Sequence, residues 1–185
     1  MPALLYEKRD GIAYLTFNRP QVRNAINPEI VVRLADAWRD YATDDSLRVA
    51  IITGAGDKAF SAGADLHTLI PLLSGARKPE DEWDRRVLAD PTLVATLQLR
   101  GFTLYKPIIA AINGFCLAGG TELIQATDLR IAAEHATFGL MEVTRALLPA
   151  GGSMVRLPRQ IPYCKAMEVM LVGDPLSAHE AHRIG

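Results

Sequence analysis

Two short runs of consecutive apolar residues constrain the fold of this chain most strongly. Arg48–Thr53 (RVAIIT) and Ile108–Asn113 (IIAAIN) each lead directly into a glycine, Gly54 and Gly114. A strand without polar alternation is typical of a sheet that is buried on both faces, and helical patterns separate the two runs. We predict an α/β fold with these runs as inner strands and Leu129–Ala132 as a third inner strand.

The N-terminal part of the chain carries local signals for a hairpin and a helix. Asp10-Gly11 separates Leu4–Lys8 from Ile12–Phe17, and this dipeptide is a strong hairpin-turn signal. Asn27 followed by Pro28 predicts the start of a helix, because asparagine caps well and proline is tolerated at the first helical position. The spacing of the next apolar residues predicts the buried face of this helix: Val31, Leu34, Ala35, Trp38 and Tyr41.

Residues 66–105 and the end of the sequence carry weaker signals for secondary structure. Residues 66–105 contain the charged stretch GARKPEDEWDRRVLADP, which we interpret as a solvated loop, and the apolar stretch LVATLQLRGFTL, which predicts one core helix. A lid or a pocket wall is the alternative for this region. Near the end of the sequence, a helix from about Tyr163 should stop at Gly173, and Ser177 with Glu180 forms a capping box for a last short helix.

Composition and charge exclude several classes of protein. With 185 residues, 49% of them apolar, the chain suits one domain with an ordinary core. Its 20 basic and 21 acidic residues show no basic footprint, so we expect no nucleic-acid partner. No apolar run reaches the ~18 residues that cross a membrane, and Cys116 and Cys164 form no disulfide framework. Apart from the pair His179 and His182 on a terminal helix, the histidines show no shared metal-ligand spacing, so we expect no metal site. The cysteines favour a reducing compartment and the first residues show no secretion-signal pattern, so we expect a cytoplasmic location.

Runs of alanine and glycine follow both buried strands, and these two halves form a loose internal repeat. The first strand leads through GAGDKAF into SAGADL, and the second leads through GF into CLAGGTEL. Small residues allow a backbone or a ligand to approach closely, and a helix start directs free N–H groups outward. This combination predicts a pocket for an anion or for a developing oxyanion.

Five segments, in order along the chain, resemble the enoyl-CoA hydratase/isomerase, or crotonase, family. They are NRPQVRNAIN (18–27), AFSAGADL (59–66), KPIIAAINGFCLAGGTELIQATDLRIA (106–132), ATFGLMEV (136–143) and VGDPLSAHEAHRIG (172–185). The resemblance implies a crotonase-like fold of repeated strand-strand-helix units, usually assembled as trimers that pair into hexamers. It also implies an acyl-CoA substrate and no separate cofactor, since coenzyme A is part of the substrate.

The resemblance further implies a catalytic site of two amides and two glutamates. The backbone N–H groups of Ala64 and Gly119 would hold the thioester oxygen, where negative charge develops. Glu122 would orient and deprotonate the water that attacks the β-carbon, and Glu142 would deliver or remove the α-proton. Taken singly, Glu122 could merely favour its helix dipole and Glu142 could be a surface residue. Their joint presence in the family's register favours function.

Residues that would hold coenzyme A are less distinctive. By resemblance, Arg23 and Ala25 border the nucleotide and the pantetheine, while Ala62, Asp65 and Leu66 line the path near the adenine. Arg23 could equally be a solvated surface charge. We expect the Asp65 carboxylate to fix its own loop through backbone hydrogen bonds rather than to contact the substrate.

The sequence departs from the family pattern in two places. EVTRALLPAGG has Ala150 where hydratases commonly carry glycine, although its amide could still hold water, and Arg145 and Ala146 replace the usual aliphatic residue and glycine. Family members also continue well beyond LSAHEAHRIG with C-terminal helices. We therefore expect residues 1–185 to be a single crotonase-like core domain without the C-terminal helical segment.

The leading hypothesis for function is an enoyl-CoA hydratase, which adds water reversibly to a 2-enoyl-CoA and gives a 3-hydroxyacyl-CoA. A double-bond isomerase tends to need only one of the two acids, so the presence of both favours water chemistry. Unusual acyl groups, as in a carnitinyl-CoA-type dehydratase, are an alternative that the departures near Arg145 leave open. A non-catalytic binding paralogue is the alternative from another class, and the intact acids argue against it.

Overall fold

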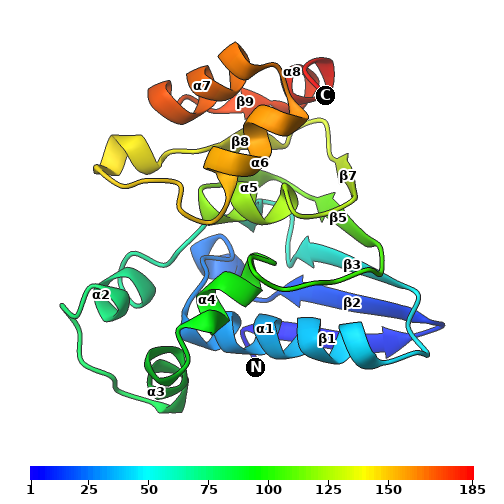
Figure 1. The fold of residues 1–185 in the computed structure, drawn as a ribbon, viewed down its shortest axis with the longest axis vertical. Coiled ribbons are helices and arrows are strands. Elements are labelled where there is room, and N and C mark those ends of the chain that lie inside the picture. The colour runs from blue at the N-terminus through cyan, green and yellow to red at the C-terminus, as the bar shows by residue number, and fades with distance from the viewer.

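In the computed structural model, which describes residues 1–185, the strands form two sheets (Figure 1). The first sheet has the order β1-β2-β3-β5-β7, and the second has the order β4-β6-β8-β9. The strands of the first sheet are β1 Leu4–Arg9, β2 Ile12–Phe17, β3 Val49–Gly54, β5 Ile108–Ile112 and β7 Leu129–Ala132. Those of the second are β4 Ala59–Ser61, β6 Phe115–Leu117, β8 Thr137–Gly139 and β9 Leu176–Ser177. The mixed α/β class is therefore confirmed.

Helices of varied length connect the strands. The α-helices are α1 Pro28–Thr43, α2 Leu69–Leu73, α3 Glu82–Ala89, α4 Thr92–Leu97, α5 Gly119–Ile124, α6 Ser153–Gln160, α7 Tyr163–Val172 and α8 Ala178–Arg183. Two 3-10 turns, η1 Pro20–Val22 and η2 Glu142–Arg145, complete the set. None of the helices is long and apolar enough to span a bilayer.

The N-terminal hairpin and the first helix form as the sequence predicts. Strands β1 and β2 pair antiparallel, and Asp10 and Gly11 both adopt positive φ angles of 54° and 77°, as the tight turn requires. The Asn27 side chain accepts a hydrogen bond from the N–H of Ile30 at 3.0 Å, which satisfies one free donor at the start of α1. Pro28 occupies the first helical position.

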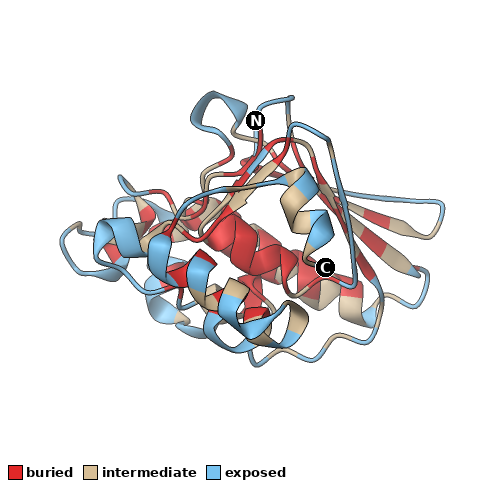
Figure 2. Ribbon diagram, turned by 90° about the horizontal axis from the view of Figure 1, so that it is seen from above, coloured by how far each residue is buried: buried red, intermediate tan, exposed pale blue.

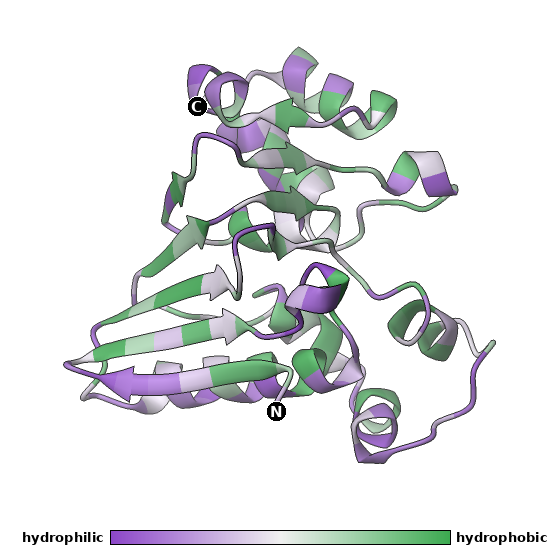
Figure 3. Ribbon diagram, turned by 180° about the vertical axis from the view of Figure 1, so that it is seen from behind, coloured by the Kyte–Doolittle hydropathy of each residue, from purple (hydrophilic) through white to green (hydrophobic).

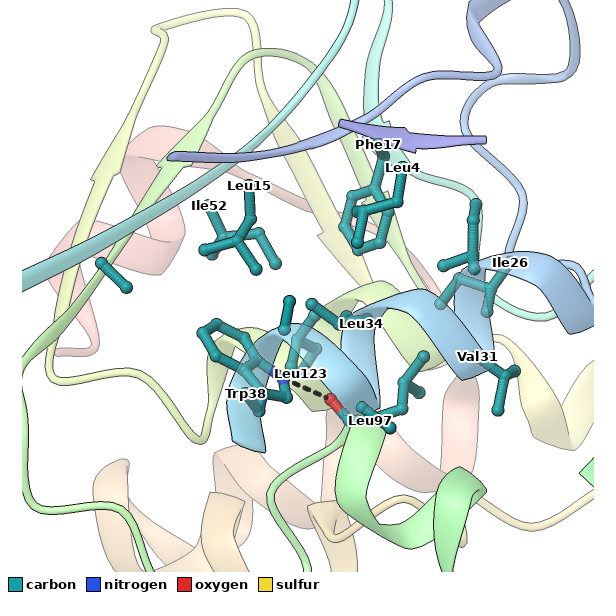
Figure 4. Close-up of a cluster of buried hydrophobic side chains, with 14 of the residues drawn as sticks. Leu4, Leu15, Phe17, Ile26, Val31, Leu34, Trp38, Ile52, Leu97 and Leu123 are labelled. Carbon is teal, nitrogen blue, oxygen red and sulfur yellow. Dashed lines mark hydrogen bonds between the residues drawn. The ribbon is translucent and has the colours of Figure 1, made fainter. Parts of the chain in front are cut away.

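The main hydrophobic core lies between α1 and the first sheet (Figures 2 and 4). All five apolar residues predicted for the buried face of α1 are fully buried. Figure 3 shows the inner strands β2, β3 and β5 as mainly hydrophobic, in contrast to the hairpin end of β1. The Trp38 indole donates a hydrogen bond to the Leu97 carbonyl at 3.2 Å, which ties α1 to the end of α4 (Figure 4).

The prediction of a third inner strand at Leu129–Ala132 is wrong. This segment is the edge strand β7, which pairs only with β5, and all four of its residues are exposed. Leu129 and Ile131 are 59% and 66% exposed. An apolar run shows that a strand is favourable, but it does not show whether a neighbouring strand or helix covers it.

Two other parts of the fold differ from the sequence prediction. The short strands β4 and β6 belong to a second sheet, which the predicted strand-to-loop sequence did not include. The charged stretch between residues 75 and 91 is not only a loop, because it contains α3, capped by the Asp81 side chain. In α3, Asp84 is buried and its carboxylate accepts a hydrogen bond from Arg77 at 2.7 Å. Pairing with Arg77 allows this carboxylate to be buried in a charged segment.

The last helices follow the prediction more closely. Helix α7 ends before Gly173, which adopts the left-handed conformation at φ 79°. The Ser177 hydroxyl accepts a hydrogen bond from the N–H of Glu180 at 3.2 Å and caps α8. A second, smaller apolar cluster lies here and is formed by Leu140, Leu157, Ala166, Val169 and Met170.

Candidate active site

The amides of Ala64 and Gly119 are brought together by the ends of β4 and β6, which pair in parallel. A Cβ atom on Gly119 would lie 3.7 Å from the Ala64 nitrogen, and one on Gly63 would lie 2.9 Å from the Gly119 nitrogen. Neither of these two amides donates to a backbone carbonyl. We call these two N–H groups the amide pair. The fold thus brings the two predicted amides together, and their role toward a developing oxyanion stays a prediction.

Glycine is required where the two loops touch. Gly63 adopts φ 84°, and a Cβ there would lie 2.7 Å from the Cβ of Ala118. Ala118 itself has φ 49° and directly precedes α5. The positive φ angles of Gly63 and Ala118 cost conformational free energy where the two turns come into contact. Strained backbone of this kind is commonly found at functional sites.

Glu122 lies in the first turn of α5 and is 4% exposed. Its Oε1 accepts a hydrogen bond from the N–H of Ser153 at 3.2 Å. Burial raises the pKa of Glu122, while hydrogen bonds from Ser153 and from the Gly151 amide, together with the charge of Arg100, oppose this rise. The prediction that Glu122 sits at the start of a helix is confirmed.

Glu142 opens the 3-10 turn η2 and is partly buried. Its Oε2 is shielded from solvent and has no hydrogen-bond partner. Burial raises the pKa of Glu142 to about 7; its own backbone N–H opposes the rise, and the charge of Glu122 adds to it. The charge of Glu122 therefore favours the protonated form of Glu142, and a carboxyl with a pKa of about 7 can hold or release a proton near neutral pH.

The residues predicted to bind coenzyme A lie on two neighbouring backbone segments, residues 23–25 and residues 62–66. The Ala62 N–H donates to the Arg23 carbonyl at 3.0 Å, and Ile26 forms a parallel bridge with Ala64. The exposed Arg23 adopts φ 54° and places its guanidinium over the Phe115 ring, 5.4 Å from the centroid. The backbone around Arg23 therefore runs beside the segment that carries Ala64 of the amide pair. The role of Arg23 in binding coenzyme A stays a prediction.

Asp65 and Leu66 differ in what they can offer a ligand. The Asp65 carboxylate accepts hydrogen bonds from Arg19 at 2.8 Å and from the N–H groups of His67 and Thr68 at 2.9 and 3.1 Å. These bonds lower the pKa of Asp65 against the effect of burial, which is the largest influence on it and acts to raise the pKa. Asp65 thus fixes its loop, as expected from the sequence. Leu66 is 50% exposed and available for contact.

The structure places three side chains or amides near Glu122 that sequence reasoning did not select. Ser153 donates its backbone N–H to Glu122. Gly151, not Ala150, provides the loop amide, because the Ala150 N–H donates to the Leu148 carbonyl at 2.8 Å. Gln98 is 8% exposed and lies against both Gly119 and Gly151. No local motif marks such residues, because their positions depend on tertiary contacts.

The geometry thus consists of two parallel strand-and-loop halves, an amide pair without backbone partners, the buried Glu122 and the partly buried Glu142. The model of the family "Enoyl-CoA hydratase/isomerase" matches residues 7–185, and the chain belongs to this family. Its fold is crotonase-like, as the solved relatives show.

Relatives with described activities share this fold over the whole chain. The chain is 40% identical over 184 residues to an enoyl-CoA hydratase, EchA19, of Mycobacterium tuberculosis, covering 100% of this chain and 66% of that protein. It is 40% identical to (E)-benzylidenesuccinyl-CoA hydratase of Thauera aromatica, covering 100% and 68%. A solved carnitinyl-CoA dehydratase from Mycobacterium avium is 38% identical, with a TM-score of 0.83 and coverage of 100% and 68%. The chain thus spans about two thirds of the length of these relatives.

Proposed function

We propose that this protein is an enoyl-CoA hydratase, which adds water reversibly to a 2-enoyl-CoA and forms a 3-hydroxyacyl-CoA. The observation that carries the proposal is the pair of glutamates: Glu122 is buried in the helix that Gly119 of the amide pair begins, and the partly buried Glu142 has its pKa raised to about 7, in part by the charge of Glu122. A carboxyl group with such a pKa can give a proton to the α-carbon of an acyl-CoA, or take one from it, near neutral pH. The names of the hydratases that resemble this chain support the same reaction.

The proposed reaction assigns one role to each group. The thioester oxygen accepts hydrogen bonds from the N–H groups of Ala64 and Gly119, which stabilise the enolate-like charge. Glu122 takes a proton from water while the water oxygen bonds to the β-carbon. Glu142 then gives its proton to the α-carbon, so that one water is added and the pair of acids carries one proton before and after. Dehydration is the reverse of these steps.

The shared proton leads to a definite pH dependence. Hydration needs Glu142 protonated and Glu122 ionised, and dehydration needs the converse arrangement of the same single proton. Because no net proton is consumed, kcat/KM should follow the same bell-shaped profile in both directions. Since the pKa of Glu142 is about 7, kcat/KM should fall as the pH rises above 7. A profile that is flat to pH 9 would contradict the assignment.

The direct test is loss of the conjugated enoyl thioester absorbance with crotonyl-CoA, comparing the wild type with Glu122→Gln and Glu142→Gln. Each substitution keeps the shape of the side chain and should lower kcat by at least about 100-fold. Glu134→Gln, an exposed glutamate outside the site, is the matched control and should retain full activity. Absence of turnover at every acyl length, or full activity in both site variants, would refute the hydratase proposal. Exchange of deuterium at the α-carbon should be lost in Glu142→Gln more completely than in Glu122→Gln.

A dehydratase acting on a substituted acyl-CoA is the second candidate. The resemblance to the carnitinyl-CoA dehydratase of Mycobacterium avium favours it, and the exposed Arg145 in η2 is the departure that could adapt the site to another acyl group. Assaying 3-hydroxyacyl-CoA thioesters with and without a charged acyl substituent would distinguish the two candidates.

The proposal includes the molecular setting of the enzyme. We infer one crotonase-like core domain over residues 1–185, a cytoplasmic location, and a homotrimer or a hexamer of two trimers. Exposed apolar side chains such as Leu129, Ile131 and Leu148 are consistent with association between subunits. Arg23, Ala25, Ala62, Asp65 and Leu66 would border coenzyme A, and no cofactor is needed. Light scattering of the purified protein tests the assembly.

A further inference from the structure

The turn that follows α4 is fixed in place by contacts from three directions. The Trp38 indole donates to the Leu97 carbonyl at 3.2 Å from the side of α1 (Figure 4). The Arg156 guanidinium donates to the carbonyls of Gln98 and Leu99 at 2.9 and 3.0 Å from the side of α6. Arg100 donates to the Ala150 carbonyl and connects the same turn to the loop before α6.

These contacts hold the Gln98 side chain between two glycines of the candidate site. The Gln98 Nε2 lies 3.4 Å from the position that a Cβ on Gly119 would take. Its Oε1 lies 1.4 Å from the corresponding position on Gly151, whose amide interacts with Glu122. The carboxamide therefore packs against Gly151 in the loop next to Glu122, and its Nε2 also approaches Gly119 of the amide pair.

The Gln98 carboxamide has no partner of its own. It is 8% exposed, its Oε1 is buried without a hydrogen bond, and its Nε2 donates to no protein atom. The hydrogen bonds of Gln98 are made by its backbone: its N–H donates to the Ala95 carbonyl at 3.1 Å, and its carbonyl accepts from Arg156. Buried polar groups in folded proteins are nearly always paired, so an unpaired carboxamide inside a site points to a ligand.

Two nitrogen atoms lie near Gly119. The position that a Cβ on Gly119 would take is 3.7 Å from the Ala64 nitrogen and 3.4 Å from the Gln98 Nε2, and the Gly119 N–H itself begins helix α5. Donors without protein partners that lie this close together favour an oxygen with negative charge. The proposed hydratase reaction produces such an oxygen on the thioester.

We propose that Gln98 is a third, side-chain donor to the thioester oxygen, in addition to the amides of Ala64 and Gly119. This inference rests on the proposed function. Gln98 Nε2 donates more strongly as charge moves onto the oxygen in the enolate-like state. Gln98 therefore accelerates the reaction rather than only binding the ground-state thioester, and Arg156 is the positioning residue that fixes its backbone.

The test uses acetoacetyl-CoA, whose α-proton is acidic and whose enolate absorbs in the ultraviolet. The pH at which bound acetoacetyl-CoA becomes the enolate reports hydrogen bonding to the enolate oxygens, without any turnover. Gln98→Met keeps the length of the side chain and removes the donor. We expect this variant to raise the pKa of the bound ligand by about 2 and to lower kcat for crotonyl-CoA about 100-fold with little change in KM.

Two further variants separate donation from structure. In Gln98→Glu, the introduced carboxyl donates only when it is protonated, so activity should recover as the pH falls, and a purely structural role predicts no such recovery. Gln160→Met is the matched control. Gln160 is the last residue of α6, and its side chain donates to the Gln125 carbonyl. This substitution should leave the pKa of the bound acetoacetyl-CoA unchanged.

The outcomes distinguish the two proposals. If the wild type fails to bind acetoacetyl-CoA and to hydrate crotonyl-CoA, the proposed function is wrong. If the wild type does both but Gln98→Met, folded by circular dichroism, leaves the ligand pKa and kcat unchanged, the donor role of Gln98 is wrong and the hydratase proposal stands.

Discussion

Replacing Glu142 by glutamine should stabilise the folded protein above neutral pH and leave its stability unchanged in acid. The pKa of this carboxyl is raised from 4.5 to about 7 in the folded state, chiefly by burial. Below pH 4.5 both the folded and the unfolded chain hold the proton, so the group has no effect. Between pH 4.5 and 7 only the folded chain holds it, and stability falls as the pH rises. Above pH 7 the loss is complete and constant.

The size of this effect follows from the shift in pKa. Each unit of pKa corresponds to about 1.4 kcal/mol, so a rise of this size would amount to about 3 kcal/mol in a fully buried site. Glu142 is only partly buried, and solvent screening reduces the expected value to about 1–2 kcal/mol. For a chain of 185 residues this corresponds to about 2–8 °C in Tm.

Urea unfolding at pH 4.5 and pH 8 measures the difference. Glu142→Gln should unfold at a higher urea concentration than the wild type at pH 8 and at the same concentration at pH 4.5. Glu134→Gln, at an exposed position, should match the wild type at both values. A Glu142→Gln variant that is equally or less stable than the wild type at pH 8 would refute the assignment of a buried, desolvated carboxyl.

Three other substitutions test particular contacts. Asn27→Ala removes the side-chain cap of α1 and should cost about 1 kcal/mol of unfolding free energy, measured by urea titration at neutral pH. Trp38→Phe leaves the buried Leu97 carbonyl without its indole donor and should cost about 1–3 kcal/mol in the same assay. Gly63→Ala forces a Cβ to 2.9 Å from the Gly119 nitrogen at a positive φ, so it should lower kcat/KM at least tenfold in the crotonyl-CoA assay even where the variant remains folded.

Local signals explain which parts of the fold the sequence predicts. Asp10-Gly11 specifies its turn through backbone conformations that those residues tolerate, and Asn27 caps α1 through a bond to a residue three positions away. The helical spacing around Trp38 identifies a buried face because a helix of this length must cover something. In each case the interacting residues are close in the sequence.

Elements that depend on distant neighbours were predicted less well. Strand β7 is apolar, but its burial depends on whether another element pairs with it, and Leu129 and Ile131 are exposed. Strands β4 and β6 have three residues each, too few to show a period, and they are held as strands by pairing with each other. Helix α3 was not predicted because its sequence is highly charged and resembles a solvated loop. In the fold, Arg77 and Asp84 form an ion pair that compensates for the burial of the Asp84 carboxylate.

The candidate site divides in the same way. Ala64, Gly119 and Glu122 were selected by the family resemblance, and the glycine-rich loops and the helix start beside them in the sequence fit those roles. Gln98 could not, since it belongs to a turn whose position is set by Trp38 and by contacts from beyond residue 150. Ser153 likewise acts through its backbone N–H, which every residue except proline possesses.

The two glutamates have different surroundings, and this difference affects how readily each carboxyl group ionises. Glu122 receives hydrogen bonds from Ser153 and from the Gly151 amide and feels the charge of Arg100, all of which favour its ionised form against burial. Glu142 has only its own N–H to favour ionisation, and the charge of Glu122 opposes it. In the proposed reaction the shared proton is placed on Glu142 and Glu122 is the base, because only Glu122 has hydrogen bonds from another residue and a cation that favour its ionised form. Because Arg100 also bonds to the Ala150 carbonyl, the contact between the turn of Gln98 and the loop before α6 keeps this cation near Glu122.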